Sequence, residues 1–192
     1  MAMHERDRAL RFERLYAHAC DPLARYLARR VRPDVVEDLL AEVMTTAWRR
    51  LADIPAGDEL PWLYGTARRV LANHRRASGR LGRLLERLAL IERGVDPGRP
   101  WGAGDDPRLG AAMAELPEAD AEVLRLWAWE ELAPREIGVA LGISPNAASI
   151  RLHRAKSRLR GRLVADRPAS TERGKTDLAP GHVAGVERTE TR

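Results

Sequence analysis

The stretch from Ala133 to Arg160 constrains the fold of this chain more than any other, because it predicts two helices joined by one specific turn. Gly142 stands where a left-handed residue would end the first helix. Ser144 and Pro145 follow as the N-cap and first residue of the second. The apolar residues at helical spacing beneath the turn are Leu132, Ile137, Leu141, Ile143, Ala148, Leu152, Ala155 and Leu159. This pattern predicts a helix-turn-helix.

The opposite face of the second helix is polar near its beginning and cationic beyond. Short hydrogen-bonding side chains at the start of such a helix reach base edges in the major groove, and arginines reach phosphates. The candidate DNA-contacting residues are Asn146, Ser149, Ile150, Arg151, His153 and Arg154. The alternative is an ordinary amphipathic hairpin whose arginines are merely solvated. The turn residues and the phase of both helices favour DNA binding.

Composition sets limits on the class of protein. The chain has 192 residues, enough for one domain or two small ones, and its net charge of +5 favours a polyanionic partner. A single cysteine, Cys20, excludes an internal disulfide and a cysteine-rich zinc site. There is no phosphate-binding glycine loop, no metalloprotease or hydrolase motif, and no apolar run of membrane-spanning length. We therefore expect a cytoplasmic protein that is not an enzyme, with no metal, no cofactor and no membrane insertion.

The hydrophobic periodicity predicts an all-α fold, since β-branched residues are sparse and never alternate. A first helix is expected from Asp7 to Cys20, and Asp21-Pro22 should end it and begin a second. A third is expected from about Val35 to Leu51, with a strong period of 3.6 residues, and a fourth from Pro61.

Charged residues gather near the ends of these expected helices. Arg29, Arg30 and Arg32 would complement the negative C-terminal end of the second helix. Acidic residues, among them Asp38 and Glu42, occupy the first two turns of the third. They either complement the helix dipole or form an exposed acidic patch, and the sequence alone leaves both interpretations open.

One stripe of the fourth helix combines an aromatic residue, a hydroxyl, an amide and arginines. Its members are Trp62, Thr66, Arg69, Asn73 and Arg76. Such a stripe, if exposed, can stack unpaired bases and hold a phosphate backbone, as single-strand binding requires. The alternative is that Trp62 packs at the helix start and the arginines only increase solubility.

Breaker residues divide the chain into two small helical domains. Residues 8–77 form the first expected domain and 109–164 the second, which contains the helix-turn-helix. Between them, residues 78–108 include a stretch rich in glycine and proline that predicts a flexible linker. Residues 165–192 have few apolar side chains and are predicted to be a disordered tail.

The second domain is expected to be electrically asymmetric. Its acidic residues are Glu115, Glu118, Asp120, Glu122, Glu130 and Glu131. We expect them to form an acidic half remote from the helix-turn-helix, which would orient the domain on DNA.

Three blocks, at residues 37–48, 61–76 and 116–160, together resemble bacterial RNA polymerase sigma factors of the extracytoplasmic-function (ECF) group. The likeness spans roughly residues 8–162, and the order and spacing of the blocks fit throughout. Taken together around a linker, the three blocks are highly specific for this family. The resemblance implies a two-domain factor that directs promoter-specific transcription initiation and has no active site of its own.

The resemblance also implies a role for each block. The first would bind the clamp helices of the largest polymerase subunit; its candidate residues are Asp38, Leu39, Glu42 and Trp48. The second block and the loop before it would open the minus-10 promoter element and capture an unpaired base. The second domain would read the minus-35 element, and the linker would pass into the RNA path of the polymerase. Many family members are held inactive by an anti-sigma factor, which becomes a further candidate partner.

Four positions depart from the common family pattern. Arg69 stands where asparagine is frequent, and Asn73 where aspartate is frequent, which makes the stripe more basic. Ser149 and Ile150 replace commoner basic and small polar residues of the recognition helix. The promoter sequence therefore cannot be inferred from the family.

Two other classes of function compete with this interpretation. One is a helix-turn-helix regulator that acts on duplex DNA without polymerase, although such a protein has no need of a strand-opening stripe. The other is a helical interaction module whose basic face meets an acidic protein, for which salt-dependent DNA binding would not be expected.

Overall fold

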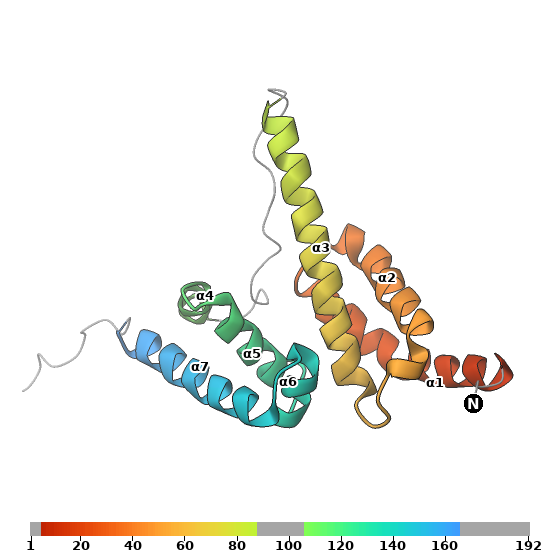
Figure 1. Ribbon diagram of the computed structural model, residues 1–192. Helices are drawn as coiled ribbons and strands as arrows, with labels where there is room; N and C mark the ends of the chain where they lie inside the picture. The colour runs from red at the N-terminus through yellow and green to blue at the C-terminus, as the bar shows by residue number, and fades with distance from the viewer. Residues whose placement is uncertain (1–4, 88–105, 166–192) are drawn as a thin grey trace, which may run out of the picture.

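The computed structural model describes residues 5–87 and 106–165, and every regular element in these ranges is a helix (Figure 1). The predicted all-α class is therefore confirmed. The elements are α1 (Glu5–Ala28), the 3-10 helix η1 (Pro33–Val35), α2 (Val36–Arg49), the 3-10 helix η2 (Leu51–Asp53), α3 (Glu59–Arg87), α4 (Pro107–Ala114), α5 (Glu118–Ala128), α6 (Pro134–Leu141) and α7 (Pro145–Ala165). Most of the predicted linker and nearly all of the predicted tail, residues 88–105 and 166–192, lie outside the described residues. None of the described helices is both long and apolar enough to cross a lipid bilayer.

Helix α1 is continuous, so the expected break at Asp21-Pro22 is wrong. Leu15, Ala19 and Leu23 stay buried on one face across the proline. Pro22 has no N–H, so the carbonyl of His18 lacks its usual helical hydrogen bond. Because His18 is exposed, solvent can hydrate that carbonyl instead. Burial of one continuous apolar face offsets the local penalty of the proline.

The first domain consists of α1, α2 and α3 packed around a shared apolar core. The predicted inward faces of α2 and α3 are confirmed by the burial of Val43, Ala47, Leu63 and Ala67. Helix α3 begins at Glu59 rather than at Pro61, because a proline in the first helical turn removes no intrahelical hydrogen bond. The same helix continues to Arg87, past the position where the linker was expected to begin.

The second domain consists of α4 to α7, in which α7 packs against α4, α5 and α6. Ala148 and Ala155 are fully buried on α7, and these small side chains allow the neighbouring helices to approach closely. Asp106 caps α4, since its Oδ1 accepts a 2.9 Å hydrogen bond from the backbone N–H of Arg108.

The two domains pack directly against each other, with α6 lying against the lower part of α3 (Figure 1). Gly65 of α3 makes this approach possible: a Cβ added there would lie 2.7 Å from the carbonyl oxygen of Ala140. Real Cβ atoms do not come so close to a backbone oxygen, so any larger residue would push the helices apart. The position of α3 against α6 therefore depends on a glycine.

Candidate nucleic-acid interface

The predicted helix-turn-helix is present in α6, α7 and the turn between them. Gly142 ends α6 with φ +67°, in the left-handed region. The Ser144 hydroxyl accepts a 3.2 Å hydrogen bond from the backbone N–H of Ala147, which confirms the predicted N-cap of α7. Ile143 is partly buried against the core beneath the turn, as expected. These local interactions fix the angle at which α7 leaves the domain.

The outward face of α7 carries the predicted duplex-contacting side chains. Asn146, Ser149, His153 and Arg154 are exposed, and Ile150 is 45% exposed despite being apolar. Arg151 is half-buried beside them. The Ser149 hydroxyl donates a 3.0 Å hydrogen bond to the carbonyl of Pro145, so it can still accept a hydrogen bond from a ligand. An apolar side chain such as that of Ile150 can contact a thymine methyl group in the major groove.

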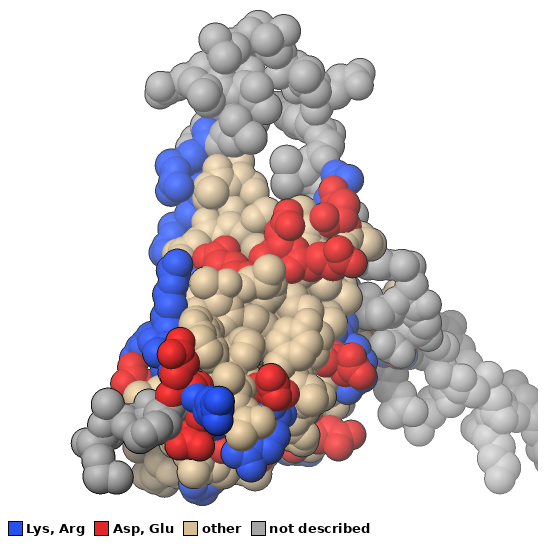
Figure 2. All heavy atoms as spheres, turned by 90° about the vertical axis from the view of Figure 1, so that its right-hand side faces the viewer, with Lys and Arg blue, Asp and Glu red and all other residues tan. Residues whose placement is uncertain are grey.

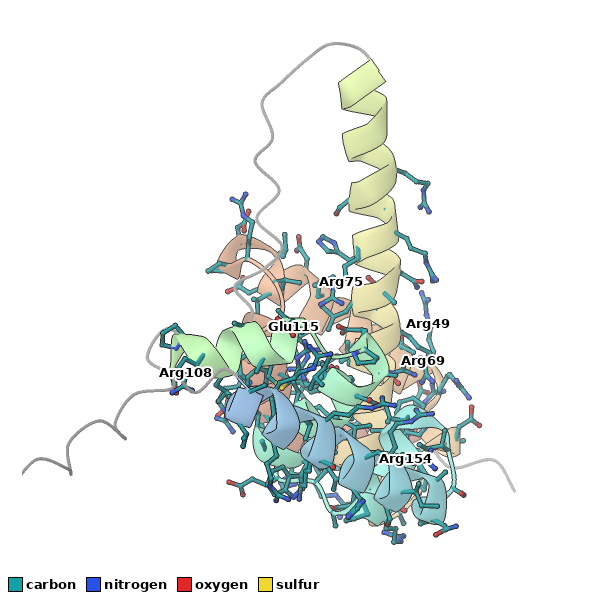
Figure 3. The ribbon with its side chains drawn as sticks, turned by 90° about the vertical axis from the view of Figure 1, so that its left-hand side faces the viewer. Arg49, Arg69, Arg75, Arg108, Glu115 and Arg154 are labelled. Atoms are coloured by element: carbon teal, nitrogen blue, oxygen red, sulfur yellow. The ribbon has the colours of Figure 1, made fainter. Side chains whose placement is uncertain are left out.

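The acidic residues of the second domain do not form a separate half, so that expectation is wrong. Asp120 pairs with Arg158, and Glu115 pairs with Arg162, and both arginines lie on α7 itself. Glu115 is labelled in Figure 3, at the end of α4. Lys156 lies over the Trp127 ring, with Nζ 3.3 Å from the ring centroid. The far end of α7 is thus partly neutralised, because these cations are close enough to find partners inside the domain. Arg154, in the middle of α7, has no such partner among the described residues.

The stripe on α3 is only partly exposed. Arg69, Asn73 and Arg76 are exposed, and Trp62 is half-buried with the Arg50 guanidinium 5.6 Å from its ring centroid. Thr66 is 2% exposed, so the expectation that it contributes to an exposed stripe is wrong. It lies one helical turn beyond Trp62, next to the buried Gly65 and Ala67.

Thr66 instead supports its neighbours in the stripe. Its hydroxyl donates to the carbonyl of Trp62 at 3.2 Å and accepts a hydrogen bond from Arg69 Nη2 at 3.1 Å. One turn further, Arg76 donates to Asn73 Oδ1. The arginines of the stripe are therefore held in place by polar neighbours on the same helix, which lowers the entropy lost when they bind a ligand.

Several arginines lie close together at this edge of the first domain. Burial and the nearby charges of Arg50 and Arg68 lower the pKa of Arg69 below its ordinary value, with burial as the largest cause. Figure 2 shows basic side chains in a column along one edge of the molecule and an acidic band across the neighbouring face. Mutually repelling guanidinium groups are stabilised by a polyanion, so this edge is suited to a phosphate backbone.

The acidic side of α2 is exposed, but not every residue predicted there is. Asp38 and Glu42 are exposed, whereas Leu39 is only 4% exposed and faces the core, so it is not available at the surface. The 3.6-residue period explains this, because Leu39 shares its face with the buried Val43. Trp48 is half-buried: Arg8 lies over its ring at 4.5 Å and Phe12 contacts it edge-on.

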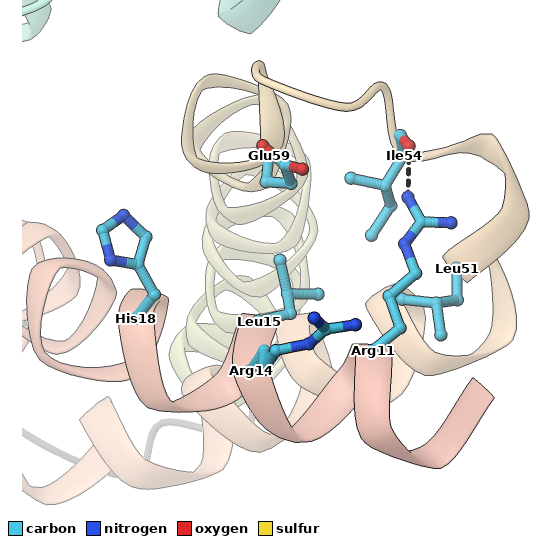
Figure 4. A pocket seen from close by; sticks show the side chains of 7 residues that line it. All are labelled: Arg11, Arg14, Leu15, His18, Leu51, Ile54 and Glu59. Atoms are coloured by element: carbon cyan, nitrogen blue, oxygen red, sulfur yellow. Dashed lines mark hydrogen bonds between the residues drawn. The ribbon is translucent and has the colours of Figure 1, made fainter. Parts of the chain in front are cut away.

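A shallow pocket of about 420 Å³ lies between α1 and the loop before α3 (Figure 4). Leu15, Leu51 and Ile54 contribute apolar side chains to it, and Arg11 donates a 2.7 Å hydrogen bond to the carbonyl of Ile54. This bond ties the start of the loop, residues 54–58, to α1.

A polar seam joins the two domains, and sequence reasoning missed it. We use "the seam" for the contact of Tyr26, Arg29, Arg30, Asp58, Tyr64 and Gly65 with Glu122, Trp129, Glu130, Arg135 and Ala140. The sequence predicts only that Arg29 and Arg30 complement the dipole of the helix that they end, since no local pattern shows that their partners lie about a hundred residues away.

Arg30 is the most buried cation of the seam, with its side chain 4% exposed. Its Nη1 donates to the Tyr26 carbonyl at 2.9 Å and to Glu130 Oε1 at 3.2 Å, and its Nη2 lies 3.6 Å from Glu122 Oε1. The guanidinium carbon also lies 3.6 Å from the centroid of the Tyr26 ring. Arg29 donates to the second carboxylate oxygen of Glu130. Both arginines thus converge on one buried acid.

Burial changes the acidity of several groups in the seam. Burial raises the pKa of Glu130 above its ordinary value and outweighs the lowering effect of Arg30 and Arg29. Burial also raises the pKa of Tyr64 to about 12. The Tyr26 hydroxyl donates to Glu122 at 3.0 Å, and burial raises its pKa as well. The cost of desolvating the Glu130 carboxylate thus offsets much of the attraction of its ion pairs.

The family comparison divides the chain as the structure does. The family description "Sigma-70 region 2" matches residues 16–81, and "Sigma-70, region 4" matches residues 107–159. The RNA polymerase sigma factor CarQ of Myxococcus xanthus is 32% identical over 155 residues, which cover 78% of this chain and 87% of CarQ.

Solved structures share the fold. The sigma factor RpoE of Bartonella quintana, solved with the anti-sigma factor NepR, has a TM-score of 0.50 at 20% identity over 85% of this chain and 98% of its own. The structure of CnrH with the cytosolic domain of CnrY has a TM-score of 0.52 at 21% identity over 81% of this chain and 88% of its own.

Proposed function

Because the chain belongs to the sigma-70 family and is an ECF-type sigma factor, we propose that its two exposed basic surfaces divide promoter recognition between them. Sigma factors are not enzymes: they bind core RNA polymerase and promoter DNA, and this chain directs transcription initiation together with the polymerase. In the proposal, one basic surface lies on α7, the other lies on α3, and the exposed acids of α2 meet the polymerase.

The surface on α7 is the proposed reader of the minus-35 duplex. Asn146, Ser149 and Ile150 lie on the first turns of the exposed face, where base edges are reached, and Arg154 follows one turn later. Arg151 and His153 flank this face. Each well-formed base contact is worth about 1–3 kcal/mol of discrimination, so a few such residues suffice for promoter choice.

The surface on α3 is the proposed site for the melted minus-10 strand. Trp62, Arg69, Asn73 and Arg76 follow one another along the helix and combine a stacking ring with cations and an amide. Thr66 is assigned a supporting role, since its hydroxyl orients Arg69 from a buried position.

The exposed acids of α2 are the proposed contact with the clamp helices of the polymerase. Asp38 and Glu42 lie one turn apart on the exposed side of α2. Leu39 and Trp48 act from the core side by holding α2 in place. Since the polymerase works in the cytoplasm, we place the protein there too. An anti-sigma factor is a further candidate partner, as the sigma factor RpoE was solved in complex with the anti-sigma factor NepR.

One observation supports this division most: the α7 face and the α3 stripe are two separate exposed surfaces of different chemistry. The test is run-off transcription with purified core polymerase on fragments of the source genome. Initiation at discrete start sites is expected only when the full chain is added. Binding to promoter duplex with no effect on transcription would instead indicate a regulator that acts without polymerase.

A further inference from the structure

Ile150 is an exposed apolar residue on the outward face of α7. Its exposed fraction is 45%, whereas Ala148 and Leu152 are buried on the other side of the same helix. At roughly 100° per residue, Ile150 lies about 200° around the helix axis from Ala148, so it points away from the core. Within the described residues it belongs neither to the buried core nor to the half-buried apolar residues that pack against that core.

The folded domain gains little from an isoleucine at this position. A β-branched residue loses side-chain freedom in a helix, so alanine or an unbranched polar residue is more favourable at an exposed helical position. Burial normally offsets this cost, but Ile150 faces solvent. A functional contribution of Ile150 must therefore come from a partner that covers it.

The surroundings of Ile150 indicate the class of this partner. Asn146 lies one turn before it, Arg154 one turn after it, and His153 beside them, and all three are exposed. An apolar side chain among polar and cationic groups does not form the contiguous apolar patch typical of a protein-docking site. Such a surface instead suits a polyanion that presents one small apolar group among hydrogen-bonding groups.

The major groove of unmodified DNA presents such a group at thymine. Guanine, adenine and cytosine offer hydrogen-bond donors and acceptors there, whereas thymine adds a 5-methyl group beside its O4 acceptor. Contact of Ile150 with this methyl group buries apolar area on both sides. Against another base, the same side chain would cover a donor or an acceptor without replacing its hydrogen bond to water. The chemistry thus favours thymine and disfavours its competitors.

The side chain of Ile150 is also held in a fixed direction before DNA binds. Isoleucine in a helix strongly prefers one χ1 rotamer, so little conformational entropy is lost when the side chain is covered. The Ser144 cap fixes the beginning of α7, and the buried Ala148 anchors the helix to its domain. Ile150 is on the second turn of α7, at the end of a recognition helix that approaches base edges.

We propose that Ile150 selects a thymine in the minus-35 element by packing on its 5-methyl group, so that this position accepts a 5-methylpyrimidine in preference to other bases. The inference rests on the proposed function of the α7 surface and names the base class that one residue of that surface reads. Asn146 and Arg154 lie four residues to either side, about 6 Å along the helix at roughly 1.5 Å per residue. Since base pairs are spaced by about 3.4 Å, their contacts should fall within about two base pairs of the thymine.

Replacement of thymine by uracil tests the methyl contact directly, because uracil keeps every hydrogen-bonding group of thymine and lacks only the methyl group. The full chain is assembled with core polymerase, and holoenzyme binding is measured on a promoter found by run-off transcription. Each thymine of the minus-35 element, on either strand, is replaced by uracil in turn. At one position the replacement should weaken binding about fourfold, the factor for removing one methyl-sized group from an apolar contact.

Ile150→Ala identifies the residue that makes this contact. The variant should bind the thymine promoter about fourfold more weakly than the wild type, and uracil at the same position should cause no further loss. Ile150→Val keeps a branched apolar side chain and should retain most of the response to uracil. The matched control is Val164→Ala, which truncates a 65% exposed apolar residue near the end of the same helix and should leave the full response. Circular dichroism should show unchanged helix content in all three variants, since alanine favours a helix and valine differs from isoleucine by one methylene group.

Methylated cytosine separates the methyl group from the rest of the thymine base. Replacing the selected T·A pair by C·G should weaken binding of the wild type, and 5-methylcytosine at that position should recover part of the loss. Ile150→Ala should bind both cytosine promoters equally. Because the two cytosines form the same base pair, this comparison removes any effect of hydrogen-bond pattern.

Three results would overturn the inference. They are equal binding of thymine and uracil promoters at every position, a uracil loss of the same size in the wild type and Ile150→Ala, and weaker binding of core polymerase by Ile150→Ala in the absence of DNA. The last would show that Ile150 faces a protein. Failure of the proposed function gives a different pattern, in which Arg154→Ala and mutated minus-35 elements leave holoenzyme binding unchanged.

Discussion

Arg135 on α6 holds Asp58, in the loop before α3, through two hydrogen bonds of 2.7 and 2.8 Å. The two residues belong to different domains, and the acid is buried while the arginine is largely exposed. A helix-turn-helix domain thus reaches across to the loop beside the proposed strand-binding stripe. The sequence separation of the pair explains why no local pattern predicted it.

Arg154→Ala should weaken binding of the holoenzyme to a minus-35 duplex by about 1–3 kcal/mol, since the side chain is exposed in the middle of α7 and has no competing partner among the described residues. Fluorescence anisotropy with a matched and a mutated minus-35 element measures the effect. Equal losses on both duplexes would assign Arg154 to a phosphate contact instead.

Arg69→Ala should reduce the affinity of the holoenzyme for a single-stranded minus-10 oligonucleotide and lower its salt dependence. Loss of one phosphate contact to a single strand changes the slope of log affinity against log salt by about 0.7. Titrations at several salt concentrations give this slope. Arg14→Ala, at an exposed arginine of α1, is the control and should leave the slope unchanged.

Asp38→Arg should weaken the binding of core polymerase, because it reverses the charge of the proposed contact on an exposed face of α2. The effect is measured by titration of labelled protein with core enzyme. Glu13→Arg makes the same change at an exposed acid of α1 and should bind as the wild type does. Unchanged affinity for Asp38→Arg would remove the acidic patch from the interface.

Gly142→Ala should destabilise the second domain by about 1–2 kcal/mol, since φ at this position is +67° and an L-residue is strained there. Thermal or denaturant unfolding of the full chain measures the change. A Gly161→Ala variant, at a helical position with open space, should not share the loss. Equal stability of the two variants would show that the turn relaxes at no cost.

Glu130→Gln should leave the two domains in contact through the seam. The pKa of Glu130 is raised in the docked state, which therefore favours the protonated acid, and a neutral isostere imitates that form. Because the pKa of Glu130 is raised in the docked state, Glu130 contributes most to docking at pH values below the ordinary pKa of a glutamate. This contribution is lost as the pH rises through the raised pKa of the docked state. Small-angle X-ray scattering at several pH values should show a difference between wild type and Glu130→Gln that shrinks in acid.

Local patterns in the sequence were enough to predict the two helical domains and the turn between α6 and α7. Gly142 and Ser144 lie within a few residues of the backbone groups they serve, so their roles follow from short-range geometry. The buried faces of α2 and α3 follow from the 3.6-residue period in the same way. The break at Pro22 was predicted wrongly, because a local breaker was outweighed by an apolar face that continues on both sides of it.

Tertiary packing alone decided which predicted surface residues are accessible. Thr66 carries suitable chemistry on the right helix, but its side chain is buried by neighbours that the sequence does not reveal. Arg30, Glu130 and Arg158 have no partner that local sequence spacing would predict, yet each forms an ion pair in the folded structure. A helix fixes the direction of its side chains from local spacing, whereas burial and ion pairing depend on which helices meet, and that is settled only when the whole chain has folded.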